Sequence, residues 1–165
     1  MIESRQLVTA LCNADVAFVI VGGMAAVAHG SSLLTADLDI CYERNSQNYE
    51  RISLALRPLH PRLRGAPAGL PFVLDPLTIK AGLNFTLITD AGDLDLLGEM
   101  SGLGTYANVR AHSEETELYG YSVWILTLEG LIISKQAAGR PKDLRVIPEL
   151  KALQALRDKS KEEGA

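Results

Sequence analysis

Residues 21–40 read VGGMAAVAHGSSLLTADLDI, and this stretch decides our interpretation of the fold. It continues a run of apolar, largely β-branched residues at 16–21, which is typical of a strand buried on both faces. Helix-forming residues follow Gly22 and Gly23 and stop at Gly30. The sequence therefore predicts that the glycine pair lies at a junction between a buried strand and a helix.

Two later segments carry aspartates at alternate positions. Residues 37–42 alternate polar and apolar side chains with the period of a half-buried strand, so Asp37 and Asp39 share one face with Cα atoms roughly 6.6 Å apart. Asp93 and Asp95 repeat this pattern. Paired carboxylates suit hard cations such as Mg²⁺, and a glycine-rich helix start suits phosphate oxygens. If these segments meet, they predict a site for a triphosphate and a divalent metal.

The remaining pattern favours a mixed α/β domain with uneven alternation of helices and strands. We expect one domain over residues 1–165, with 127–158 as a helical C-terminal segment. The Pro- and Gly-rich stretch at 58–71 is expected to be the most mobile loop. The other expected elements are a helix at 3–14, a helix at 46–57 capped by Ser46, strands at 84–89 and 94–97 joined by 90–93, a loop at 98–104, a short helix at 106–110, strands at 116–119 and 122–126, and helices at 127–138 and 143–157 before a frayed tail.

The composition of the chain excludes several classes of function. The chain has 165 residues and 47% hydrophobic content, which is enough for a core without disulfides or structural metal. A net charge of -4 argues against a broad electrostatic grip on nucleic acid. The first residues lack a signal-peptide pattern, and no window holds the ~18 apolar residues that a membrane helix needs. We expect a cytoplasmic protein without a membrane partner.

The stretch at 21–40 resembles the signature of the nucleotidyltransferase superfamily, the DNA polymerase β-like enzymes. The loop length between Gly23 and Asp37 fits that signature, and GDLDLLG at 92–98 resembles the element that carries the third carboxylate of the family. Lys135, followed by AAGRPKDL at 137–144, resembles small bacterial members related to AbiEii-type components of toxin–antitoxin systems.

The resemblance implies the nucleotidyltransferase fold, an α/β (α+β) domain with a mixed central sheet flanked by helices and a helical C-terminus. It also implies metal-dependent transfer of a nucleoside monophosphate from an NTP to a hydroxyl acceptor, with Mg²⁺ or Mn²⁺ as cofactor and release of pyrophosphate. Leu33 and Leu34 stand where many relatives carry a basic residue. The implied site residues are Asp37, Asp39 and Asp95 as catalytic and metal-binding carboxylates, Gly22 and Gly23 around the triphosphate, and Lys135, or Lys142 with Arg140, as the basic charge.

Several alternatives stay open at the sequence level. Asp93 shares a strand face with Asp95 and is an alternative third carboxylate. The acceptor is a tRNA, a protein or a small molecule, and the preferred base is undetermined. The second hypothesis is a non-catalytic binding module or antitoxin-like protein that keeps the fold, with a partner protein or second subunit completing its site. For His29 we expect an interaction with helix-terminal carbonyls rather than catalysis.

Overall fold

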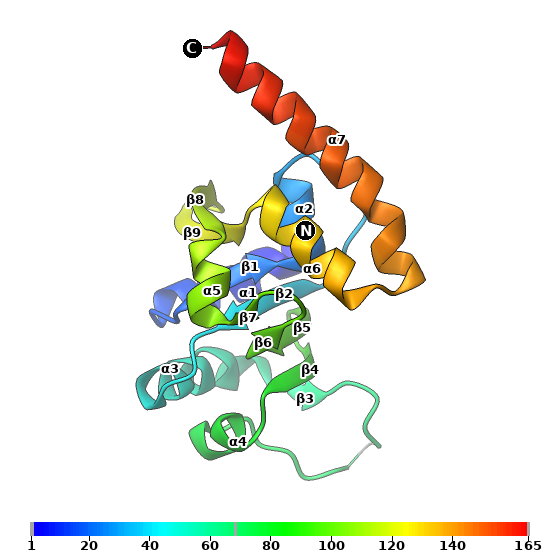
Figure 1. Cartoon of the computed structure of the whole chain (residues 1–165). Helices are drawn as coiled ribbons and strands as arrows, with labels where there is room; N and C mark the ends of the chain where they lie inside the picture. Colours follow the sequence, from blue (N-terminus) through cyan, green and yellow to red (C-terminus); the bar gives the residue numbers. More distant parts are fainter. Residues whose placement is uncertain (1, 68, 165) are drawn as a thin grey trace.

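The computed structural model describes residues 2–67 and 69–164, and a seven-stranded mixed sheet forms its centre (Figure 1). The strand order is β3-β4-β5-β2-β1-β9-β8, and a separate two-stranded sheet pairs β6 with β7. The strands are β1 (Phe18–Val21), β2 (Leu38–Tyr42), β3 (Arg62–Leu63), β4 (Asn84–Thr89), β5 (Gly92–Leu97), β6 (Glu99–Met100), β7 (Gly104–Thr105), β8 (Ser113–Leu118) and β9 (Tyr121–Leu126).

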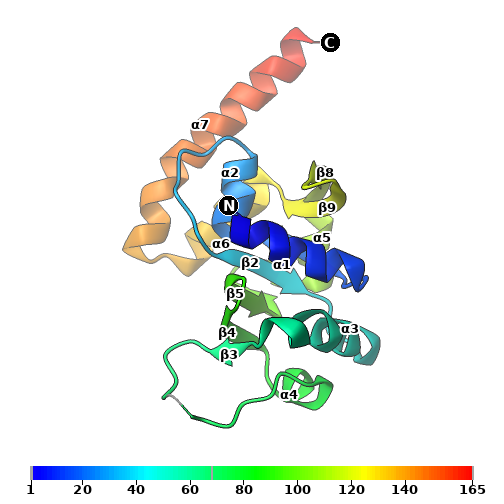
Figure 2. The ribbon, with the colours of Figure 1, turned by 180° about the vertical axis from the view of Figure 1, so that it is seen from behind.

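Helices cover both faces of this sheet. Figure 2 shows α1 and α3 side by side on the face that is turned away in Figure 1, whereas α5 lies on the opposite face. The helices are α1 (Ile2–Asn13), α2 (Gly22–Ala28), α3 (Ser46–Leu56), α4 (Pro76–Ala81), α5 (Tyr106–Ala111), α6 (Leu128–Ala138) and α7 (Pro141–Glu163), with a 3₁₀ turn, η1 (Arg57–Leu59), after α3. None of the described helices is long and apolar enough to cross a membrane.

The apolar run at 16–21 forms the buried strand that its composition predicts. All four residues of β1 are buried, and β1 pairs with β2 on one side and β9 on the other. β2 is antiparallel to β1 and parallel to β5. Because β2 lies between these two strands, its aspartate is placed at the centre of the sheet, next to the end of β1.

Both predicted hairpins form. In the first, Thr89 pairs with Gly92, so the turn consists of Asp90 and Ala91, and β5 begins two residues before the predicted strand. Asp93 therefore lies within β5. In the second, Tyr119 and Gly120 take φ values of 54° and 82°, the left-handed conformation that a tight two-residue hairpin turn requires.

Several local predictions were wrong, including that of a loop without strands at 58–71, which contains β3. The side chain that caps α3 belongs to Asn45, not Ser46, and accepts the Asn48 backbone N–H at 2.8 Å. The expected loop at 98–104 contains the β6–β7 hairpin. The tail continues α7 as far as Glu163, since its lysines and glutamates are good helix formers.

α6 begins where it was predicted, whereas α7 begins at Pro141, two residues before the predicted start at Asp143. Thr127 caps α6 by accepting the Gly130 backbone N–H at 3.1 Å, and Gly139, with φ 66°, ends that helix. The far end of α7 projects beyond the rest of the molecule (Figure 1). Its middle contacts the loop before β2, because Glu149 accepts hydrogen bonds from the backbone N–H and hydroxyl of Ser32 at 2.9 and 3.2 Å.

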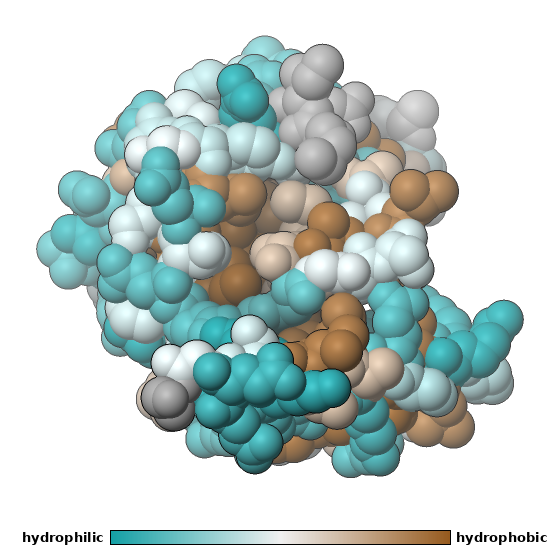
Figure 3. Space-filling model, turned by 90° about the horizontal axis from the view of Figure 1, so that it is seen from above, coloured by the Kyte–Doolittle hydropathy of each residue, from teal (hydrophilic) through white to brown (hydrophobic). Residues whose placement is uncertain are grey.

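A groove beside the far part of α7 is lined by this helix, α2 and the β8–β9 hairpin. Figure 3 views the molecule from this end and shows hydrophobic side chains gathered in a hollow among hydrophilic ones. His29 lines the groove, and its Nε2 lies 2.8 Å from the backbone oxygen of Leu126. Its Nδ1 lies 3.5 Å from Glu114, which also binds Arg157. His29 therefore joins elements across the groove and contacts a β9 carbonyl rather than the end of its own helix.

Candidate active site

Two of the predicted carboxylates lie next to each other. Asp39 of β2 is paired in register with Asp95 of the parallel strand β5, so both side chains leave the same face of the sheet at adjacent positions. On the other side of β2, Asp39 is paired with Val21, the last residue of β1. The strand register thus brings together two carboxylates that are 56 residues apart in sequence with the beginning of α2.

Because Gly22 has no side chain, the carboxylate of Asp39 can occupy the space beside it. Gly22 has φ 64°, and a Cβ atom at this position would overlap Asp39 Oδ2. At Gly23 a Cβ atom would lie 2.8 Å from Thr35 Oγ1, so this glycine lets the loop before β2 approach the start of α2. The glycine pair is therefore required by close approach of the Asp39 strand and its loop.

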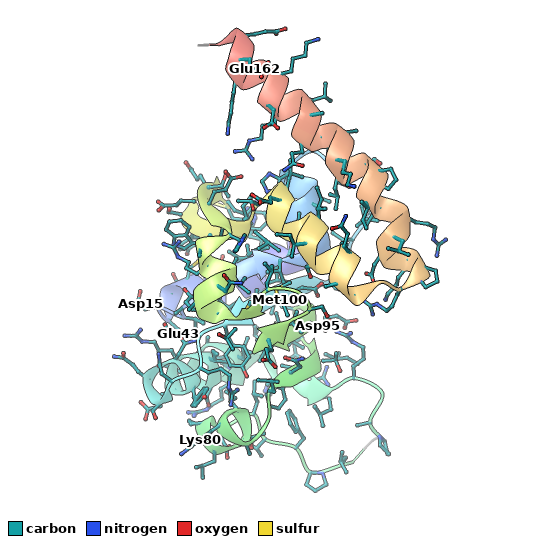
Figure 4. All side chains as sticks on the ribbon, in the orientation of Figure 1. Asp15, Glu43, Lys80, Asp95, Met100 and Glu162 are labelled. Atoms are coloured by element: carbon teal, nitrogen blue, oxygen red, sulfur yellow. The ribbon has the colours of Figure 1, made fainter. Side chains whose placement is uncertain are left out.

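A cleft of about 240 Å³ opens beside these residues. Gly22 and Asp39 line one wall, and Lys135, Ser134 and Arg140 line the wall built by α6 and the start of α7. In Figure 4, Asp95 of β5 and Met100 of β6 lie below α6. The remaining lining residues are Val21, Asn84, Leu97, Glu99, Met100, Ser101, Leu131, Ala138 and Asp143.

The electrostatic surroundings of Asp39 disfavour its charge. Burial, followed by the negative charges of Asp95 and Asp37, raises the pKa of the Asp39 carboxyl to about 6, while Lys135 acts in the opposite direction. The Asp95 carboxylate is also close enough to form a hydrogen bond that stabilises protonated Asp39. A cation placed here would relieve this repulsion.

An arginine that the sequence analysis did not identify holds the second aspartate. Arg64, directly after β3, donates from Nη2 to Asp95 Oδ1 at 2.9 Å, and its Nε lies 3.3 Å from Asp93 Oδ2. Asp93 and Asp95 therefore share one guanidinium. Local sequence carries no signal for this contact, because 31 residues separate Arg64 from Asp95.

The opposite wall of the cleft contains a buried carboxylate, Asp143, whose negative charge is balanced by two cationic side chains. Asp143 is 1% exposed and accepts from Arg140 Nε at 2.6 Å, and Lys135 Nζ lies 3.4 Å away. Asp143 also accepts the backbone N–H of Arg140, the N-cap residue of α7, at 3.2 Å, so it lies inside the first turn and closes the start of this helix. Lys135 and Arg140 line the cleft, whereas Lys142 is exposed and is not among the lining residues.

The donor set fits a cation that substrate oxygens also bind. Asp37 lies one residue before β2, and its charge reaches Asp39. Within the described residues, no group of three histidine, cysteine or acidic side chains gathers to hold a metal ion. Mg²⁺ usually keeps several waters and is bound by one or two carboxylates together with substrate phosphates. The Asp39–Asp95 pair beside the cleft matches this mode of binding.

Comparison with known proteins identifies the fold. The chain is similar to the crystal structure of a "putative nucleotidyltransferase" from Thermotoga maritima, with a TM-score of 0.52 over 96% of this chain and 91% of that chain, at 16% sequence identity. This chain has the nucleotidyltransferase fold. No family model matches the chain, and no curated protein matches it. The nucleotidyltransferase fold, with its mixed sheet flanked by helices, is the fold that the sequence predicts.

Proposed function

We propose that this protein is a nucleotidyltransferase that moves a nucleoside monophosphate from an NTP to a hydroxyl acceptor and releases pyrophosphate. The observation that carries the proposal is the in-register pair of Asp39 and Asp95, because Asp39 lines one wall of the cleft beside Gly22 and Lys135 lines the other wall. Nucleotidyl transfer needs this combination, because the negative charge of the triphosphate must be balanced while the acceptor hydroxyl is positioned.

We assign a role to each of the implied site residues. Asp39 and Asp95, together with substrate oxygens and with Asp37 nearby, would hold Mg²⁺ or Mn²⁺, which would supply charge stabilisation for the phosphoryl oxygens and the attacking oxygen. Gly22, which lines the cleft, and the adjacent Gly23 would lie beside the triphosphate at the start of α2. Lys135, with its nitrogen near Asp143 at the cleft, would bind phosphate oxygens as a point charge.

The second cationic contact with phosphate is assigned to Arg140 in preference to Lys142. Arg140 lines the cleft and is oriented by Asp143, whereas Lys142 is exposed and does not line the cleft. Bidentate binding of phosphate oxygens suits the planar guanidinium of Arg140.

Asp95 is preferred to Asp93 as the third carboxylate because Asp95, not Asp93, is the residue paired with Asp39.

Binding of nucleotide and metal tests the proposal directly. Calorimetric titration with each NTP in the presence of Mg²⁺ should give micromolar binding to the wild-type protein and none to the Asp37→Asn/Asp39→Asn double variant. Asp90→Asn is the matched control, since Asp90 lies in the β4–β5 turn and binds His60 and Arg62. Binding that persists in the double variant would show that the nucleotide site lies elsewhere.

A label on the α-phosphate then identifies the acceptor class. Transfer of the label to tRNA, to a protein or to a small molecule separates the three acceptors that the sequence leaves open. A non-catalytic role remains the second candidate, because Arg64 already neutralises Asp95. NTP binding without label transfer to any of the three would favour that role. A cytoplasmic, AbiEii-type bacterial toxin–antitoxin component, completed by a partner protein or a homodimer, is our proposal for its biological setting.

A further inference from the structure

Arg64 is fixed to the sheet by its backbone, while its side chain reaches across a strand. Its backbone N–H donates to the Thr86 oxygen of β4 at 2.9 Å, which continues the β3–β4 pairing by one residue. Its guanidinium reaches over β4 to β5, and Nη2 donates to the Leu87 oxygen of β4 at 3.0 Å and to Asp95 of β5 at 2.9 Å. Thr86 is paired in register with Asp95. Arg64, Asp95 and Asp39 therefore form one row across the sheet.

This row places two different neighbours beside Asp95. On one side lies Asp39, whose charge repels that of Asp95, and on the other lies Arg64, whose charge attracts it. The Nε of Arg64 is buried and lies 3.3 Å from Asp93 without a hydrogen bond of good geometry. The guanidinium is thus held by hydrogen bonds to Asp95 and to the Leu87 carbonyl and by the charge of Asp93. Among the described residues, no other side chain forms a hydrogen bond with it.

We propose that Arg64 is a positioning residue that occupies Asp95 in the substrate-free protein and couples divalent cation binding to nucleotide binding. The inference rests on the proposed function, because it takes Asp39 and Asp95 as the cation ligands. A guanidinium at hydrogen-bonding distance from Asp95 opposes a second cation at the same carboxylate. The nucleotide phosphates supply negative charge that favours the divalent cation, so that it displaces the guanidinium from Asp95.

The anchoring of Arg64 explains how it can release Asp95 without unfolding its strand. The backbone hydrogen bond to Thr86 does not involve the side chain, and the hydrogen bond to the Leu87 carbonyl is independent of any carboxylate. When a cation takes Asp95, the guanidinium keeps this carbonyl and Asp93 as partners. Loss of the Asp95 contact is therefore a rotation of one side chain, not a rearrangement of the sheet.

Mn²⁺ binding to the nucleotide-free protein tests this role without any measure of activity. The spin-resonance signal of free Mn²⁺ reports the affinity, and Arg64→Met should bind Mn²⁺ at least about tenfold more tightly than the wild type. Arg62→Met is the matched control: Arg62 is two residues away and binds Asp90, so its removal should leave the affinity within about twofold. Arg64→Lys, with one donor group instead of a fork, should lie between wild type and Arg64→Met.

A non-hydrolysable NTP analogue measures the coupling itself. In the wild type the analogue should raise Mn²⁺ affinity by a larger factor than in Arg64→Met, since the variant has lost the competing charge. If Arg64→Met does not fold, the Arg64→Lys variant carries the same comparison. Equal or weaker Mn²⁺ binding by a folded Arg64 variant, with Asp39→Asn still reducing it, overturns the role of Arg64 alone. Mn²⁺ binding that is unchanged in Asp39→Asn overturns the proposed function as well.

Discussion

The two walls of the cleft each carry a largely buried carboxylate, and the two carboxylates are treated in opposite ways. Asp39 lies on β2 beside two other negative charges, and burial with those charges raises its pKa to about 6. Asp143 is more completely covered, yet its hydrogen bonds from Arg140, with the nearby charge of Lys135, lower its pKa. Burial alone therefore does not decide the protonation of these groups.

The difference teaches how to separate a structural carboxylate from a binding one. Asp143 has its partners within the chain, Arg140 and Lys135, and it orients these two cationic side chains at the cleft. Asp39 lacks compensation of this kind, and Arg64 compensates its neighbour Asp95 instead. A carboxylate whose negative charge is unfavourable in the ligand-free protein is a candidate for binding a positively charged ligand, because the ligand would offset that charge.

The largest effect is expected for activity. Asp39→Asn should reduce nucleotidyl transfer by at least about 10²–10³-fold, because it removes a charge on which the proposed site depends. Asp143→Asn should reduce it by only about tenfold, since that residue acts through Lys135 and Arg140. Steady-state transfer of α-labelled NTP measures both. Equal losses in the two variants would break the distinction between the walls.

A smaller effect is expected at the glycine beside Asp39. Gly22→Ala should lower transfer about 10²-fold, because the new methyl group displaces Asp39 from its position. Gly104→Ala is the matched control: Gly104 has φ 77° but open space around it, so its substitution introduces backbone strain alone. Similar activity in the two variants would show that the close approach of Gly22 to Asp39 is unimportant.

The pH dependence of stability should have opposite signs at the two carboxylates. The raised pKa of Asp39 makes its ionisation unfavourable to folding, so the wild type should lose up to about 3 kcal/mol relative to Asp39→Asn as pH rises from 4 to above 6. The lowered pKa of Asp143 is stabilising above the unfolded value, so the wild type should lose stability relative to Asp143→Asn as pH falls below about 4. Urea unfolding across this range checks both slopes, and parallel slopes would contradict the assignment.

The smallest effect is expected at the partner of Asp143. Arg140→Lys keeps the charge but loses the forked contact through Nε and Nη2. Because Arg140 is itself largely exposed, the free energy of unfolding should fall by only about 0.5–1 kcal/mol. Thermal unfolding at pH 8 provides the measurement. A loss several times larger would mean that Asp143 depends on this one partner.

Much of the fold could be predicted because its signals are local. The apolar run before Gly22 predicted β1, the alternating aspartates predicted β2 and β5, and the helix expected at 127–138 forms as α6. The prediction that Ser46 caps α3 failed because Asn45, one residue earlier, offers an equally suitable side chain. The β6–β7 hairpin was missed because its two strands are two residues each, too short for an alternation to show.

The candidate site was predicted less completely. Asp39, Asp95 and Lys135 come to the cleft region as the family resemblance implied, although their catalytic roles remain predictions. Arg64 escaped notice because its partners lie two strands away, and strand order is not contained in any short window of sequence. The choice between Arg140 and Lys142 depends on which face of α7 meets the cleft, and both residues lie near the start of that helix, where no earlier turn sets the direction.

The hydrogen bonds between Ser32 and Glu149 have a consequence for the design of shortened chains. They tie the loop that leads into β2 to the middle of the C-terminal helix, so the helix serves as a brace for a segment more than 100 residues earlier. A protein cut before Glu149 would keep every aspartate of the sheet and still lose the support of the loop that delivers Asp37. Removal of the projecting end beyond Arg157 would leave that brace in place.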